Sequence, residues 1–292
     1  MTNQSKVLLD GLVFPESPRW HDGRLWFSDI QAHRVISVGL NGDSQIVGEF
    51  DDEPSGLGFL SDGSLLVVLR VQRQLVCLEA NRMRAYANLR EYSGPAVGTG
   101  PPPSDYLLND MVVDARGRAY IDKFMRRHAQ DQGADLGESL LFVSAEGHHR
   151  VAADGLMGPN GLAVTPDGRT LIVAESPLNR LTAFTVQPDG SLTDRRLFAH
   201  LGQHRPDGIC LDEEGAVWVA GPWAHQVLRV LEGGRVTQSV STGDKGPLAC
   251  ALGGEDRRTL LIASATFEQG RWSEAHGFIE YCSVDVAGAG WP

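Results

Sequence analysis

The chain has 292 residues, with 26 lysine and arginine residues against 37 aspartate and glutamate residues and a formal net charge of −11. This acidic balance argues against nucleic acid or another polyanion as a partner. The opening residues, MTNQSKVLLDGL, lack an apolar run long enough for a signal peptide, and no segment approaches a membrane span, so we expect a cytoplasmic protein with no membrane partner.

The predicted elements begin with a short apolar strand at residues 6–9, and six repeats follow it. Within each repeat, short β-branched or aromatic runs are bounded by Gly, Asp, Asn and Pro, and no stretch keeps a helical period for three turns. A tight turn recurs in every repeat, at Gly23, Gly63, Gly117, Gly168, Gly215 and Asp256. The separations of 40, 54, 51, 47 and 41 residues match the period of a four-stranded propeller blade. The sequence therefore predicts an all-β fold, a six-bladed β-propeller, with residues 1–292 in a single domain.

The last repeat supplies only three strands, LACALGG, TLLIASAT and FIEYCSVDV. We expect the N-terminal strand to be the fourth strand of this blade, which closes the ring and protects an open sheet edge. The upper rim is defined here as the end of the ring at which the first strand of each repeat begins. Three long loops are predicted on this rim, at 92–106, 123–138 and 267–277, and loops of this length in a compact fold are often functional.

One polar residue recurs seven or eight positions ahead of the turn glycine, at the start of the first strand of five repeats. These residues are Glu16, Ser55, Asn109, Asn160 and Asp207, and the sixth repeat has Leu248 in their place. Equivalent positions in a ring of repeats are related by rotation about its axis, so their side chains are expected to face a common point.

The chemistry of this set indicates a site for a hard cation. Glu16 and Asp207 supply two carboxylates, Asn109 and Asn160 supply amide oxygens, and no His or Cys occupies an equivalent position. Oxygen ligands favour Ca²⁺, with Mg²⁺ or Mn²⁺ as alternatives. A lone Asn or Asp at a strand start commonly caps a turn, but four at one rotational position argue for a shared role. The four cysteines lie in apolar strands without metal-ligand spacing and are interpreted as reduced, buried thiols.

The same segments resemble the SMP-30/gluconolactonase/luciferin-regenerating family over the whole chain. The resemblance is carried by PESPRW, LNDMVVDARGR, GPNGLAVTPDGRTLIVAES, RPDGICLDEEGAVWVA and the terminal VDVAGAGWP. It implies a propeller that binds one divalent cation, usually Ca²⁺ or Zn²⁺, through the counterparts of Glu16, Asn160 and Asp207. It also implies that Asn109 lies beside the metal as a ligand or a substrate contact. Family members hydrolyse lactones, and relatives hydrolyse phosphotriesters.

One departure from the family concerns substrate recognition. The mammalian sugar lactonases of this family resemble RxND where this chain has Leu107 two residues before Asn109, so an arginine expected to hold sugar hydroxyls is missing. We therefore favour a lactone less polar than gluconolactone, with Arg70 or Glu175 as alternative contacts for hydroxyls. An apolar set on the upper rim is expected to close over the substrate: Phe14, Phe124, Met125, Trp223, Phe267 and Trp272. The predicted substrate contacts are Asn109, Leu107, Phe124, Trp223, Glu175 and His276.

The predicted reaction is metal-assisted hydrolysis of a small-molecule lactone or ester. Asp207 is the candidate general base, or alternatively a direct nucleophile, and Glu16 and Asn160 position the ion. Asp110 and Asp122 are expected to support these ligands. A phosphotriesterase would use the same groups, and a propeller that serves only as a binding module is a further alternative. The monomer is the expected state, and a homodimer through edge pairing is the alternative.

Overall fold

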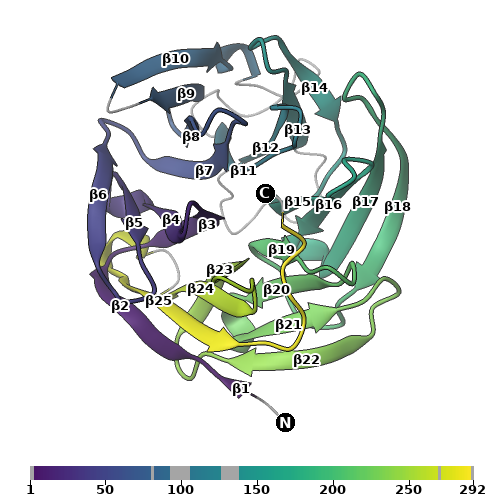
Figure 1. Cartoon of the computed structure of the whole chain (residues 1–292). Helices are drawn as coiled ribbons and strands as arrows, with labels where there is room; N and C mark the ends of the chain where they lie inside the picture. The colour runs from purple at the N-terminus through teal and green to yellow at the C-terminus, as the bar shows by residue number, and fades with distance from the viewer. Residues whose placement is uncertain (1–2, 80–81, 93–105, 126–137, 269–270, 291–292) are drawn as a thin grey trace.

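A computed structural model describes residues 3–79, 82–92, 106–125, 138–268 and 271–290 of the chain. In these ranges the strands form six small sheets, arranged as a ring around a central axis (Figure 1). The predicted all-β fold with six four-stranded blades is confirmed. No helix in the described ranges is long and apolar enough to cross a membrane.

In each blade four antiparallel strands form a sheet, with one strand nearest the axis and the fourth toward the outside (Figure 1). The first blade contains β3 (Pro15–His21), β4 (Arg24–Asp29), β5 (Arg34–Val38) and β6 (Ser44–Glu49). The second contains β7 (Pro54–Phe59), β8 (Leu65–Leu69), β9 (Gln74–Glu79) and β10 (Arg82–Asn88). The third contains β11 (Tyr106–Val113), β12 (Ala119–Met125), β13 (Ser139–Val143) and β14 (His149–Ala153). The fourth blade contains β15 (Pro159–Val164), β16 (Thr170–Glu175), β17 (Arg180–Val186) and β18 (Leu192–His200). The fifth contains β19 (Ile209–Leu211), β20 (Val217–Gly221), β21 (Gln226–Val230) and β22 (Val236–Ser241). Short 3-10 turns occur at η1 (Ile30–Ala32), η2 (Arg90–Tyr92), η4 (Ser176–Leu178), η5 (Pro222–Ala224) and η6 (Trp272–Glu274).

The sixth blade joins the two ends of the chain. Its inner strands are β23 (Gly246–Gly253), β24 (Thr259–Thr266) and β25 (His276–Ser283), and its outer strand is β2 (Lys6–Leu12). Strand β2 pairs antiparallel with β25, with Lys6 opposite Tyr281. The N-terminal strand therefore closes the ring as the strand count predicts.

The N-terminal segment makes a second pairing that the sequence does not predict. Strand β1 (Asn3–Gln4) runs parallel to β22 and adds a fifth strand to the fifth blade. Between the two strands, the Ser5 hydroxyl donates to the Glu280 carboxylate at 2.8 Å and to the Ser241 carbonyl at 3.1 Å. Residues 3–12 thus bridge the outer edges of two blades.

Apolar side chains fill the six interfaces between neighbouring blades. Each interface has a buried cluster drawn from two adjacent sheets, for example Val112 and Tyr120 of the third blade with Leu162 and Val173 of the fourth. Because every blade packs against both neighbours, the ring holds its innermost strands in fixed positions around the axis.

Bulges in the innermost strands give the polar repeat position its special geometry. The strand register shifts at that position in β3, β7, β11, β15 and β23. A bulge turns a side chain out of the regular alternation of a strand. Adjacent inner strands also approach closely, since a Cβ atom at Gly161 would lie 2.5 Å from the Asp207 carbonyl oxygen. Because Gly161, which follows the motif residue Asn160, has no Cβ atom, the inner strand of the next blade can pack this closely.

Candidate functional site

Glu16 and Asp110 lie on the first strands of the first and third blades, and Ser17 connects them. The Ser17 backbone N–H donates to Glu16 Oε2 at 2.9 Å, and the Ser17 hydroxyl donates to Asp110 Oδ1 at 2.8 Å. Ser17 has a positive φ of 51°, a left-handed conformation that is unfavourable for a residue other than glycine. This conformation places both of its donors on buried carboxylates, since Glu16 is 8% and Asp110 is 5% exposed.

Asn160 and Asp207 meet between the fourth and fifth blades. Asp207 lies just before β19, and its backbone N–H donates to the Ala220 carbonyl at 2.9 Å. The Asn160 side chain lies close enough to the Asp207 carboxylate to lower the pKa of that carboxyl, against the larger effect of burial. The Asn160 Oδ1 atom is buried and accepts no hydrogen bond. This amide therefore offers an unused oxygen next to a carboxylate.

Glu16, Asp110 and Asp207 form the carboxylate cluster, which carries more negative charge than its surroundings balance. Burial raises the pKa of Glu16 well above its usual range, and the charges of Asp207 and Asp110 raise it further. Burial, followed by the charge of Asp110, raises the pKa of Asp207 to about 8. The pKa of Asp110 is also raised by burial, although Arg19 and the Ser17 hydroxyl oppose the shift. These mutual effects show that the three side chains lie within electrostatic range of one another.

Asp122 lies beside this cluster on β12. It is fully buried, and neither carboxylate oxygen has a hydrogen bond of regular geometry. Burial raises the pKa of Asp122 strongly, and the charge of Asp110 adds to the shift. The charge of Asp110 thus acts on Asp122, and the support of the ligands by these two acids stays a prediction.

Two arginines lie near the cluster, and the sequence does not predict Arg19 as a site residue. Buried Arg19 donates to the Pro18 carbonyl at 2.8 Å and to the Met111 carbonyl, and its charge acts on Asp110 and Glu16. Arg70, predicted only as an alternative hydroxyl contact, forms an ion pair of 3.2 Å with Glu53 and lowers the pKa values of Glu16, Asp110 and Asp122. Neither arginine recurs in the other repeats, so the alignment of repeats gave no signal for them.

Asn109 lies on β11 and is half-buried. Its backbone carbonyl accepts a hydrogen bond of 2.7 Å from the Ser55 hydroxyl, so Ser55 links the second and third blades. Ser55 is buried and its own carbonyl accepts from Ser28 at 2.6 Å. The serine at the repeat position therefore has a structural partner, whereas the assignment of the Asn109 side chain to a ligand or substrate contact stays a prediction.

Leu107 and Phe124 are opposite each other on β11 and β12. Leu107 is only 3% exposed, and Phe124 is half-buried. The Arg70 guanidinium lies 5.8 Å from the centre of the Phe124 ring. An apolar pair with one arginine near its aromatic ring thus occupies the region where the resemblance leads one to expect an arginine at 107, and at its low exposure Leu107 itself offers little surface to a substrate.

Phe267 contacts Trp223 and lines a hollow together with His276. The rings of Trp223 and Phe267 meet edge to face at 5.7 Å, and Phe14 lies 6.2 Å from Phe267. His276 is exposed and lines a hollow of about 330 Å³ together with Phe267. Trp223 is 47% exposed and available to a ligand. The side chains of Met125 and Trp272 lie outside the described part of the structure.

The burial of Glu175 argues against its predicted role as a substrate contact. Glu175 is 0% exposed and accepts hydrogen bonds from the Met157 backbone N–H, the Thr182 hydroxyl and the Arg180 guanidinium. Asp29 has the same environment in the first blade, since it accepts from the Phe14 N–H and from Arg34. Both acids therefore hold the loop before the inner strand in place. The sequence contains a signal for this role, because each acid precedes an arginine by five residues.

Within the ranges that the structure describes, no three His, Cys, Asp or Glu side chains form a group suited to a metal ion. Glu16 and Asp207 supply only two carboxylates, so the side-chain oxygens of Asn109 and Asn160 would be needed to complete a set of metal ligands.

Residues 14–266 match the model of the SMP-30/Gluconolactonase/LRE-like region. The chain belongs to this family.

Three members or structural neighbours illustrate the relationship. A 6-deoxy-6-sulfogluconolactonase from Pseudomonas putida is 29% identical over 259 residues, which cover 87% of this chain and 84% of the relative. A calcium-binding protein, regucalcin, from Agrobacterium tumefaciens has a TM-score of 0.81 at 20% identity, with coverage of 100% and 98% of the two chains. A gluconolactonase from Xanthomonas campestris has a TM-score of 0.72 at 22% identity, with coverage of 94% and 89%. The two structural neighbours show the same fold.

Proposed function

We propose that this family member is a divalent-cation-dependent lactonase that hydrolyses a small-molecule lactone at the upper rim. The observation that carries the proposal is the meeting of Asn160 and Asp207, with Glu16 within electrostatic range and an Asn160 oxygen left without a hydrogen bond. The name of the Pseudomonas relative supports lactone chemistry.

A cation fits these residues on chemical grounds. Two carboxylates and an unused amide oxygen are the donor types that Ca²⁺ prefers, and waters can complete the coordination. Positive charge would also relieve the repulsion that raises the pKa values of Glu16 and Asp207. Glu16, Asn160 and Asp207 would hold the ion, with Asn109 as a fourth ligand or a substrate contact. Ca²⁺ is favoured over Zn²⁺, Mn²⁺ and Mg²⁺, and the calcium-binding neighbour from Agrobacterium supports this choice.

When bound, the cation supplies Lewis acidity for a carbonyl and acidifies water. In the proposed reaction a water oxygen bonds to the lactone carbonyl carbon while Asp207 accepts the proton of that water. The ring C–O bond then breaks, and the ring oxygen takes the proton to give a hydroxy acid. The charge of a bound cation would keep the Asp207 carboxylate ionised, so that it can accept the proton of a neighbouring water. Direct attack by Asp207 on the substrate is the alternative route.

The substrate is proposed to be less polar than gluconolactone. The half-buried Phe124 provides apolar surface beside the buried Leu107, and Trp223 and Phe267 provide a second pair of apolar rings. A sugar hydroxyl buried against such surface would lose its water hydrogen bonds, at about 1–3 kcal/mol for each unpaired group. Arg70, above the Phe124 ring, is the residue most able to reverse this preference.

A phosphotriesterase is the second candidate, because the same carboxylates and cation suit a phosphorus centre. The test is a pair of assays on one preparation, with δ-valerolactone and paraoxon as substrates, each repeated with the Asp207→Asn variant. The proposal predicts rapid lactone opening that is lost in the variant. Rapid paraoxon hydrolysis with no lactone opening would favour the second candidate, and turnover of neither substrate would favour a binding module.

A further inference from the structure

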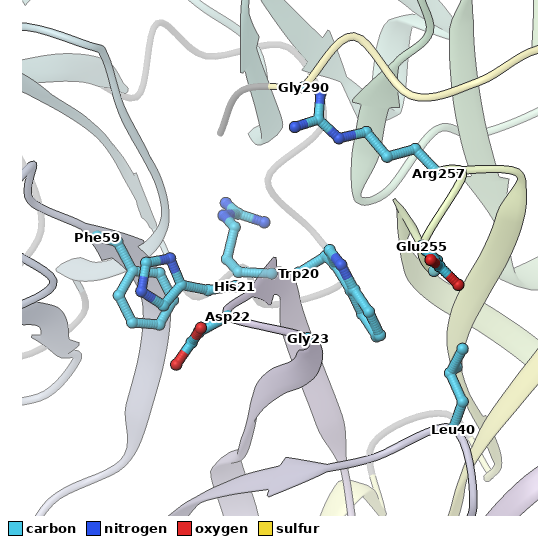
Figure 2. A pocket seen from close by; sticks show the side chains of 11 residues that line it. Trp20, His21, Asp22, Gly23, Leu40, Phe59, Glu255, Arg257 and Gly290 are labelled. Carbon is cyan, nitrogen blue, oxygen red and sulfur yellow. The ribbon is translucent and has the colours of Figure 1, made fainter.

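A cavity of about 650 Å³ lies at the lower rim, opposite the candidate site. Strand β3 runs from Glu16 near the upper rim to His21 at the lower rim, and the cavity begins where this strand ends (Figure 2). Its walls come from the first, second and sixth blades. The volume is in the range of cavities that bind small molecules.

Flat aromatic side chains form part of the wall. The His21 ring is stacked on the Phe59 ring, with centres 3.7 Å apart and an angle of 11°. Burial lowers the pKa of His21, so its ring is neutral at pH 7. Trp20 is packed over Gly253, where a Cβ atom would lie 2.4 Å from the indole. These contacts fix the rings before any ligand arrives, which reduces the entropy lost on binding.

Arg257 supplies positive charge on the other side of the cavity. Figure 2 shows its side chain reaching toward Gly290, well separated from the stacked His21 and Phe59. Its backbone is held in the left-handed region, with φ of 57°, by bonds to the Gly254 carbonyl at 3.2 Å and from the Gly288 N–H at 2.9 Å. Among the described residues, the Arg257 guanidinium forms no ion pair with a carboxylate.

Arg19 lines the same cavity from the side of the axis. It is 9% exposed, and its Nε atom is buried without an acceptor, although its terminal nitrogens donate to backbone carbonyls. Two acids, Asp22 and Glu255, also line the cavity, and like Arg257 they are exposed. The buried part of the wall holds Arg19 and the Phe59 ring but, within the described ranges, no carboxylate.

We infer that this cavity binds a small organic anion, a carboxylate that carries a flat aromatic ring. The guanidinium of Arg257 matches a carboxylate through two parallel hydrogen bonds. The ring would stack on Trp20 or on the outer face of the His21–Phe59 pair. The inference uses no residue of the carboxylate cluster and does not depend on the proposed lactonase activity.

The test is isothermal titration of the full chain with 2-naphthoate in buffer containing EDTA, which keeps cations out of the measurement. The expected result is saturable binding at one site, with 2-naphthamide and acetate at least about tenfold weaker because each lacks the charge or the ring. Arg257→Gln should weaken naphthoate at least about tenfold, and Arg257→Lys should fall between this variant and the parent.

Arg258→Gln is the matched control, since it removes the same charge from the adjacent residue. Arg258 donates to the Asp285 carbonyl at 3.1 Å and does not line the cavity, so its loss should leave affinity within about twofold. If Arg257→Gln and Arg258→Gln weakened naphthoate binding equally, the loss of affinity would come from net charge and not from a contact with Arg257. Absence of saturable binding, or equal binding of the amide, would overturn the inference.

Discussion

Ser17 donates to two carboxylates at once, to Glu16 through its backbone N–H at 2.9 Å and to Asp110 through its hydroxyl at 2.8 Å. One residue of the first blade thus joins a predicted ligand to an acid of the third blade. The left-handed backbone of Ser17 has an energetic cost of roughly 1–2 kcal/mol, which the two charge-assisted hydrogen bonds offset. The pair explains how two buried acids are held close together in spite of their repulsion.

The first prediction concerns the ligands. Glu16→Ala and Asp207→Ala should each lower cation affinity or lactone turnover at least about tenfold, because each removes a charged oxygen ligand from a small set. Affinity is measured by titration with Ca²⁺ and turnover by lactone opening.

Ser55→Ala is the control for the repeat position. It removes only the hydrogen bond to the Asn109 carbonyl, so stability should fall by about 1 kcal/mol while cation affinity is retained. Full cation-dependent turnover in Asp207→Ala would show that the ligand assignment is wrong.

The second prediction concerns pH and the cation-free protein. The folded-state pKa values of Glu16, Asp110 and Asp207 are raised, so between about pH 4 and pH 8 the folded protein holds protons that the unfolded chain has lost. Their contribution to stability is complete at the acidic end and is lost as the pH rises. In EDTA, the Tm should therefore fall toward pH 8 through this effect, and Ca²⁺ should reverse much of the fall.

Asp207→Asn provides the comparison in the same thermal melts. It removes one ionisable group from the carboxylate cluster, so its Tm in EDTA should decline less steeply with pH than that of the parent. Parallel declines in the two proteins would mean that Asp207 is not a source of the pH dependence.

The third prediction concerns ring closure. Removal of residues 1–10 deletes most of β2 and the Ser5 hydrogen bonds, which exposes the edge of β25. The unfolding free energy should fall by several kcal/mol, at about 25 cal/mol for each Å² of apolar burial lost. Denaturant melts measure this change, with a deletion of residues 1–2 as the control. A midpoint unchanged by the longer deletion would rule out a stabilising role for β2.

The fourth prediction concerns substrate choice. An alkyl δ-lactone should have a higher kcat/KM than glucono-δ-lactone, and Leu107→Arg should narrow or reverse this ratio by supplying a hydroxyl donor. Leu107→Met tests whether a change at this buried position acts by packing alone, and it should leave the ratio within about twofold. If the parent enzyme had a tenfold higher kcat/KM for glucono-δ-lactone, a residue other than Leu107 would control the recognition of hydroxyls. Arg70 would then be the first residue to mutate.

The sequence predicts the repeated features of the molecule well, because repetition places equivalent residues by rotation. The six blades and the closing strand follow from the spacing of turns and the missing last strand. The bulges at Glu16, Asn109 and Asn160 occur where the alignment of repeats places the motif. Features that occur once are different, because only the tertiary fold brings Ser17 to Asp110 or β1 to β22.

Burial explains why the structure does not support the predicted substrate contact at Glu175. Glu175 was selected for its position on the upper rim, but at 0% exposure its charge is balanced by Arg180 and by donors from the protein. The spacing of five residues shared with Asp29 and Arg34 indicates this pairing in the sequence alone. A repeated acid is thus a ligand candidate only where no basic residue is repeated with it.

The most direct test of a cation-dependent lactonase is the initial rate of lactone opening as Ca²⁺ is added back to EDTA-treated protein. The account predicts negligible turnover at the start, recovery that saturates near one Ca²⁺ per chain, and no recovery in Glu16→Ala over the same range. Full turnover in EDTA, or recovery that is equal in the Glu16→Ala protein, would contradict it.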